Sequence, residues 1–189
     1  VRIAKIGFEY AQKRTKKLCC VDKANVLETS RLWRETVQSM EKDYPDIKVS
    51  YEFVDAVAMR LVQWPNSYDV LITSNLFGDI LTDEASVISG SMGLMPSASV
   101  GSKNALYEPI HGSYPEAAGK NIANPIASIL SLSMMLEHSF NLKKESDIIT
   151  NAVEDSLKNK YVTPDLSSGK ISYTTNQVGD YIIDYIEKN

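Results

Sequence analysis

The sequence predicts an α/β fold, on three observations. Short runs of β-branched and aromatic residues alternate with longer segments in which apolar residues recur at helical spacing, as in proteins whose helices pack on a sheet. The 189 residues are enough to bury a sizeable core without a metal or a disulfide. Apolar residues make up 43% of the chain and charged residues 23%, which matches ordinary globular domains and excludes a disordered or collagen-like chain.

The first part of the chain is predicted to form a helix followed by three strand–helix pairs. The opening helix carries Ile3, Ile6 and Tyr10 on one apolar face. Asn25 is the expected N-cap of the second helix, and Pro45 closes that helix. The strands are expected at residues 18–21, 47–54 and 69–73, and the helices that follow them at residues 26–43, 56–63 and 78–88.

The composition changes after residue 88. Residues 89–125 are rich in glycine and proline, and a loop of this length with so many apolar residues is expected to be functional rather than disordered. Helical patterns resume at residues 126–140, 145–159 and 177–187. The predicted domains are residues 1–98 and residues 99–189.

Charge and cysteine content exclude several classes of protein. The formal net charge is −4, so there is no basic excess for binding nucleic acid. No run of apolar residues is long enough to span a bilayer. The two cysteines, Cys19 and Cys20, are neighbours and are poorly placed to bridge each other, which favours a reduced, cytoplasmic location.

Two aspartates four positions apart are the first candidates for chemistry. Helical spacing places Asp79 and Asp83 on one face, close enough to bind a hard cation such as Mg²⁺. Asp55, at the end of a predicted strand, is a candidate third oxygen ligand. The structural alternatives are that Asp79 lies in the first turn of its helix, where the dipole favours anions, and that Asp55 is an N-cap.

Lys23 and the segment 108–113 are further candidates. Lys23 follows a short apolar strand, so partial desolvation would suit it to proton transfer; the alternative is a solvated surface lysine.

The segment 108–113 combines small residues, backbone donors and His111 in one loop that could approach a nucleotide closely. The chain has no G-x-G-x-x-G fingerprint, and His138 is interpreted as a histidine at a helix C-terminus.

Together these segments resemble the β-decarboxylating dehydrogenases, whose members act on isopropylmalate, isocitrate, homoisocitrate or tartrate/malate. The resemblance rests on VDKANV (21–26), NLFGDILTD (75–83) and EPIHGS (108–113), while GSMGLMPSAS (90–99) is most similar to the isopropylmalate enzymes. It implies a layered α/β/α fold, the C-terminal part of a two-domain enzyme. It also implies NAD-dependent oxidative decarboxylation of 3-isopropylmalate in leucine biosynthesis, with Mg²⁺ or Mn²⁺. The alternatives are a non-catalytic dimerisation or regulatory module of the same fold, and a related decarboxylating dehydrogenase that acts on isocitrate, homoisocitrate or tartrate/malate.

The resemblance also implies roles for individual residues. Asp55, Asp79 and Asp83 would hold the metal, and Lys23 would accept the hydroxyl proton. Lys23 and Asp55 would serve the active site of a neighbouring subunit, so a homodimer is expected. An acidic residue at position 116 favours NAD over NADP, because it would repel a 2′-phosphate. The residues expected to bind the cofactor are Asn25, Glu108, His111, Gly112, Ser113, Tyr114, Glu116, Ile122, Ala123 and Asn124.

Members of this family are longer chains. The resemblance implies that the arginines which grip the substrate and the tyrosine which protonates it lie in an N-terminal part that precedes this sequence. The 189 residues alone are therefore expected to lack dehydrogenase activity.

Overall fold

The computed structural model describes residues 1–169 and 171–189. It confirms the α/β class and divides the chain into two compact units, Val1–Ala85 and Ser86–Asn189. This division falls earlier than the boundary predicted between residues 98 and 99, which refers to the domains of a two-domain enzyme and stays a prediction. Within the described ranges, no helix combines the length and the apolar character needed to cross a membrane.

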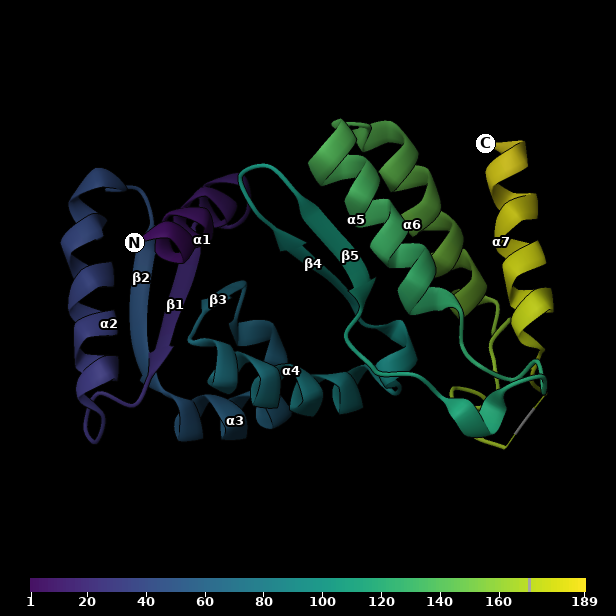
Figure 1. The fold of residues 1–189 in the computed structure, drawn as a ribbon, viewed down its shortest axis with the longest axis horizontal. Helices are drawn as coiled ribbons and strands as arrows, with labels where there is room; N and C mark the ends of the chain where they lie inside the picture. Colours follow the sequence, from purple (N-terminus) through teal and green to yellow (C-terminus); the bar gives the residue numbers. More distant parts are fainter. Residues whose placement is uncertain (170) are drawn as a thin grey trace. The chain divides into compact units, whose positions relative to one another are not determined.

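The first unit is built on a parallel sheet with the strand order β2-β1-β3. The strands are β1 (Lys17–Asp22), β2 (Lys48–Phe53) and β3 (Val70–Ile72). Figure 1 shows β1 between its two neighbours, and Leu18 lies opposite Val49 on one side and Val70 on the other. Because the strands are parallel, the C-terminal ends of β1 and β2 meet at one edge of the sheet, where α/β proteins commonly bind ligands.

Helices cover both faces of this sheet. They are α1 (Arg2–Lys13), α2 (Glu28–Met40), α3 (Val54–Gln63) and α4 (Asn75–Ser89). Side chains of β1 alternate between two apolar clusters, as the pleat of a strand requires. Leu18 and Cys20 pack with residues of α1 and α2, whereas Cys19 and Val21 pack with residues of α3 and α4. The layers are therefore helix, sheet and helix, as the resemblance implies.

The cysteines lie on opposite faces of β1 and are both free, as expected for neighbours in a strand. Burial raises the pKa of the Cys19 thiol to about 11 and that of Cys20 to about 12. Both side chains are therefore protonated at neutral pH and act as small apolar residues of the core.

The face that α1 buries is not the one that carries its largest apolar residues. Ile3, Ile6 and Tyr10, which share one apolar face in the sequence, are exposed in this unit. The buried residues are instead smaller on average: Ala4, Gly7, Phe8 and Ala11. Gly7 lies against β3 so closely that an added Cβ would stand 2.2 Å from Cγ2 of Ile72. Close packing of the helix on the sheet, rather than the size of its apolar residues, decides which face is buried.

Two predicted helix starts are also wrong. Asn25 does not cap α2, because Val26 and Leu27 both donate to the Lys23 carbonyl in a turn, and the helix begins at Glu28 with Leu27 as its N-cap. The helix predicted from Gly78 begins at Asn75. The 3₁₀ turns at 41–43 and 65–67 complete the connections of this unit.

The second unit contains a β-hairpin within residues 89–125, which are predicted to form a loop. Its strands β4 (Pro96–Val100) and β5 (Ala105–Pro109) pair antiparallel, and Gly101 donates to the Asn104 carbonyl in the turn. Short one-turn helices at Met92–Leu94 and Pro115–Ala117 flank the hairpin.

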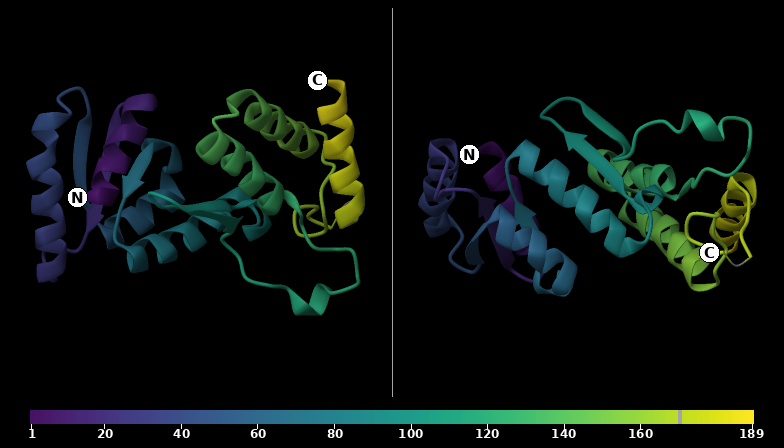
Figure 2. Two further views of the ribbon diagram at one scale, coloured as in Figure 1. Left: turned by 45° about the horizontal axis from the view of Figure 1, so that its top comes forward. Right: turned by 90° about the horizontal axis from the view of Figure 1, so that it is seen from below.

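Three helices complete the second unit. They are α5 (Ile126–Phe140), α6 (Lys143–Lys158) and α7 (Thr175–Lys188), close to the predicted ranges. Helix α5 packs on the hairpin and on α6, as Figure 2 shows, and α6 packs on α7. An apolar cluster in the described part of this unit includes the buried residues Ile126, Ala152, Val153, Val178 and Ile182.

Candidate functional site

Lys23 and Asp55 form an ion pair at the edge of the sheet in the first unit. The Lys23 Nζ atom donates to Oδ1 of Asp55 at 2.5 Å, and the two side chains are 25% and 64% exposed. This bond, together with the backbone N–H groups at the start of α3, holds the pKa of Asp55 below its usual range. Asp55 is not an N-cap, because that position belongs to Phe53; it lies in the first turn, where the dipole also favours its charge.

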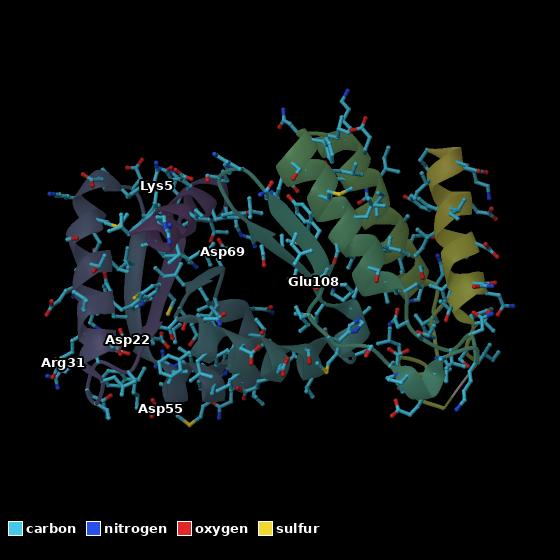
Figure 3. All side chains as sticks on the ribbon, viewed as in Figure 1. Lys5, Asp22, Arg31, Asp55, Asp69 and Glu108 are labelled. Atoms are coloured by element: carbon cyan, nitrogen blue, oxygen red, sulfur yellow. The ribbon has the colours of Figure 1, made fainter. Side chains whose placement is uncertain are left out.

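A buried carboxylate holds the turn that presents Lys23. The Asp22 side chain is fully buried and accepts two bonds from Arg34, at 2.7 Å and 2.9 Å. It also accepts the backbone N–H of Ala24 at 2.9 Å, on the far side of Lys23. Figure 3 labels Asp22 and Asp55 at this edge of the first unit. The chain on both sides of Lys23 is therefore fixed to one buried anion.

The Phe53 ring lies against both cations of this cluster. The Lys23 Nζ atom is 5.6 Å from the ring centroid, and the Arg34 guanidinium carbon is 5.3 Å from it. The guanidinium also lies 5.6 Å from the Tyr51 ring. Cation–π contacts of this kind restrain a long side chain without neutralising it. Lys23 is thus a positioned cation and not a freely solvated surface lysine.

Asp79 and Asp83 lie one turn apart on α4, and both are exposed. The first turn of α4 contains no acidic residue, so the explanation of Asp79 by the helix dipole is wrong. Within residues 1–169 and 171–189, no three His, Cys, Asp or Glu side chains of one chain gather into a group that could hold a metal. The metal roles of Asp55, Asp79 and Asp83 stay predictions.

A cavity of about 360 Å³ in the second unit brings together most of the residues predicted to bind the cofactor. Seven of them line it: His111, Gly112, Ser113, Tyr114, Ile122, Ala123 and Asn124. Glu108 on β5 and Glu116 in the short helix that follows Tyr114 are not among the lining residues. Asn25 belongs to the first unit.

His111 lines the cavity, and its two ring nitrogens differ in their hydrogen bonding. Its Nδ1 atom lies 2.9 Å from the Gly112 carbonyl oxygen, and since a carbonyl only accepts, Nδ1 carries the proton and donates. The Nε2 atom is buried and has no hydrogen-bond partner in the described part of the chain. A buried polar nitrogen in this state is suited to bond with a ligand.

Four lining residues were not predicted: Ser91, Met92, Gly93 and Asp165. The first three belong to the motif at 90–99, which carries the resemblance to the isopropylmalate enzymes. Asp165 accepts bonds from the side chains of Ser91, Asn124 and Thr163. No local pattern marks Asp165, because two of these partners lie far from it in the sequence.

Comparisons with known proteins identify the family of the chain. The family model described as isocitrate/isopropylmalate dehydrogenase matches residues 1–182. The chain is 53% identical to the 3-isopropylmalate dehydrogenase of Aquifex aeolicus over 99% of this chain and 52% of that protein. It is 54% identical to the enzyme of the same name from Bacteroides fragilis, over 99% of this chain and 53% of the relative.

Solved structures show the same likeness. The crystal structure of isocitrate dehydrogenase from Methylococcus capsulatus matches 98% of this chain and 55% of its own, with 40% identity and a TM-score of 0.93. A β-decarboxylating dehydrogenase from Thermococcus kodakarensis matches with 38% identity and a TM-score of 0.88, over 99% of this chain and 54% of its own. The chain spans about half the length of the curated relatives it matches. It belongs to the isocitrate/isopropylmalate dehydrogenase family.

Proposed function

We propose that this chain supplies the metal-binding carboxylates and the adenosine pocket of an NAD-dependent enzyme that oxidises and decarboxylates 3-isopropylmalate in leucine biosynthesis. The cavity that gathers seven of the predicted cofactor residues carries this proposal. The names of the curated relatives support 3-isopropylmalate as the substrate.

The residues of the cavity fit the adenosine portion of NAD. His111 Nε2 is a buried acceptor, and Gly112 has open space where a side chain would be, so its backbone is accessible to a ligand. The side chains of Ile122 and Tyr114 supply apolar surface for a base. Bound NAD would supply the acceptor for the hydride removed from the substrate, with Asn25 assigned to the nicotinamide.

The carboxylates of α4 fit a divalent metal by their chemistry. Asp79 and Asp83 offer exposed oxygens on adjacent turns, which Mg²⁺ and Mn²⁺ accept as ligands. When bound, the metal would act as a Lewis acid toward the substrate hydroxyl and carboxylate. Lys23, held by the Asp22 turn, is assigned to take the hydroxyl proton, for which its side chain must be in the neutral amine form.

Asp55 is assigned to the metal site of a second copy of the chain, so the proposed enzyme is a homodimer. Exposed apolar side chains on α3 and α4 support a surface that a second copy covers: Met59, Val62, Leu76 and Ile80. The pairing of Lys23 with Asp55 then delivers the proton acceptor and a metal ligand together.

The reaction is tested in a fusion in which these 189 residues replace the matching half of the Aquifex aeolicus relative. We expect NADH formation with 3-isopropylmalate, because this chain would supply the metal-binding carboxylates, Lys23 and the nucleotide cavity that the remaining half of the relative lacks. The substitution Lys23→Met should lower kcat by roughly 100-fold or more while the fusion stays folded. No NADH formation by the folded fusion, or turnover unaffected by Lys23→Met, would contradict the proposal.

The cofactor choice is tested by reversing the charge at position 116. Glu116→Lys is expected to raise the affinity for NADP⁺ relative to NAD⁺ by about tenfold, because a cation there attracts the 2′-phosphate that the carboxylate repels. Calorimetric titration of both nucleotides measures the ratio. Glu154→Lys, the same change at an exposed position of α6, is the matched control. An equal shift in both variants would show a general charge effect and would mean that Glu116 does not act on the bound nucleotide.

A further inference from the structure

Asp165 joins three segments around the nucleotide cavity. The Oδ2 atom accepts both the Ser91 hydroxyl and the Asn124 amide, the latter at 3.0 Å, and Oδ1 accepts the Thr163 hydroxyl at 2.6 Å. Ser91 and Asn124 also line the cavity, as Asp165 itself does. One carboxylate therefore connects two walls of the cavity to the chain that follows α6.

The Asn124 side chain is committed at both of its ends. Its Nδ2 atom donates to Asp165, and its Oδ1 atom accepts the backbone N–H of Ile126 at 3.0 Å, at the start of α5. This pair of bonds fixes which end of the amide faces which neighbour.

Gly93 then packs directly on Asn124. A Cβ added to Gly93 would stand 2.7 Å from the Cβ of Asn124 and 2.9 Å from its Nδ2 atom. The Gly93 N–H donates to the Ser91 hydroxyl oxygen at 3.0 Å, and that hydroxyl in turn donates to Asp165. A closed circuit of contacts thus runs through Asp165, Asn124, Gly93 and Ser91, and it forms one side of the cavity.

The charge of Asp165 strengthens the circuit. Burial opposes ionisation, but the bonds from Ser91, Thr163 and Asn124 outweigh it and lower the pKa of Asp165. The carboxylate is therefore ionised at neutral pH, and hydrogen bonds to an ionised acceptor are about twice as strong as neutral ones.

We propose that Asp165 is a positioning residue for the nucleotide: it acts through Asn124 and Ser91 to hold the wall of the adenosine pocket in its binding shape. This inference rests on the proposed function, because the ligand is taken to be the adenosine portion of NAD. Glu116 sets the choice between cofactors, whereas Asp165 sets the affinity for either.

The test is a double-mutant cycle on NAD⁺ affinity, measured by calorimetry on the full 189-residue chain. Asp165→Ala is expected to weaken binding by about tenfold, the loss of roughly one charge-assisted hydrogen bond. Asp165→Asn, which keeps an acceptor oxygen, should recover part of this loss. In a background of Ser91→Ala/Asn124→Ala, the substitution Asp165→Ala should cost little more affinity, because both of its paths to the ligand are already removed.

Two further measurements separate positioning from a loss of fold. The Asn124 side-chain amide signal in NMR spectra of the nucleotide-free chain should shift in Asp165→Ala, and the midpoint of thermal unfolding should stay close to that of the control Asp184→Ala, an exposed residue of α7. Losses that add in full in the cycle would show direct contact with the ligand and overturn the positioning role. Affinity unchanged in Asp165→Ala would overturn it as well. If the unsubstituted chain bound no NAD⁺, the nucleotide site itself would be wrong and the role of Asp165 would fall with it.

Discussion

Replacing Asp22 with alanine is expected to destabilise the first unit by about 3 kcal/mol. The substitution leaves the Arg34 guanidinium without its anion and the Ala24 N–H without its acceptor. Removing one partner of a buried ion pair costs about 3–5 kcal/mol, and the 26% exposure of the Arg34 side chain favours the lower end of that range.

Tryptophan fluorescence during urea unfolding measures this change selectively. The only two tryptophans of the chain, Trp33 and Trp64, lie in the first unit, so the signal reports that unit and not the second. Asp46→Ala is the matched control, because Asp46 pairs with Lys16 at 3.7 Å with its side chain 76% exposed. Such a surface pair contributes less than about 1 kcal/mol. An equal loss in the free energy of unfolding in both variants would show that the buried pair of Asp22 and Arg34 stabilises the unit no more than a surface pair does.

Asp22 therefore supports both the stability of the first unit and the position of Lys23. The bonds of Asp22 span Lys23, and the Phe53 ring at the end of β2 contacts both Lys23 and Arg34. A variant at Asp22 should therefore disturb the position of Lys23 even under conditions in which the unit remains folded. The proposed role of Lys23 as proton acceptor therefore requires the packing at the edge of the sheet as well as the lysine side chain itself.

Local sequence patterns predicted those parts of the fold that local interactions decide. Helix α5 has its predicted bounds, residues 126–140, because its apolar content and its flanking residues are unambiguous. The hairpin was missed because Pro96 and Gly101 read as loop residues and its first strand holds mostly small side chains. The buried face of α1 was missed because periodicity shows that a helix has two faces but not how close the sheet approaches Gly7.

Some residues of the candidate site could likewise be predicted from local patterns, and others could not. Spacing alone placed Asp79 and Asp83 on one helix face, and the motif 108–113 pointed to the loop that lines the cavity. Asp165 could not be found by either route, because its bond to Ser91 joins positions 74 apart in the sequence and its bond to Asn124 joins positions 41 apart. Contacts of that range are decided by packing of the whole unit.

Saturable Mn²⁺ binding is expected to be lost in the double variant Asp79→Asn/Asp83→Asn. Asparagine keeps the shape of each side chain but removes its charge, and hard divalent cations depend on carboxylate oxygens. We expect the dissociation constant measured by calorimetry to rise by at least about tenfold. The matched control is Asp180→Asn/Asp184→Asn, a pair of exposed aspartates at the same spacing on α7. Equal weakening in both double variants would mean that Mn²⁺ binds to acidic surface in general.

The sharing of this site between two copies is tested by mixing variants. Asp55→Asn alone should weaken Mn²⁺ binding, although Asp55 lies in its own chain beside Lys23. If Asp55 completes the site of a second copy, mixing Asp55→Asn with Asp79→Asn/Asp83→Asn lets each mixed dimer form one intact site and one that lacks all three carboxylates. Random re-pairing of equal amounts then restores about a quarter of the sites. No recovery after mixing would show that all three ligands come from one chain or that the copies do not exchange, and a crosslinked mixed dimer separates these two outcomes. Recovery of binding would require the metal to lie between two copies, with Lys23 delivered to the same place by the subunit that supplies Asp55.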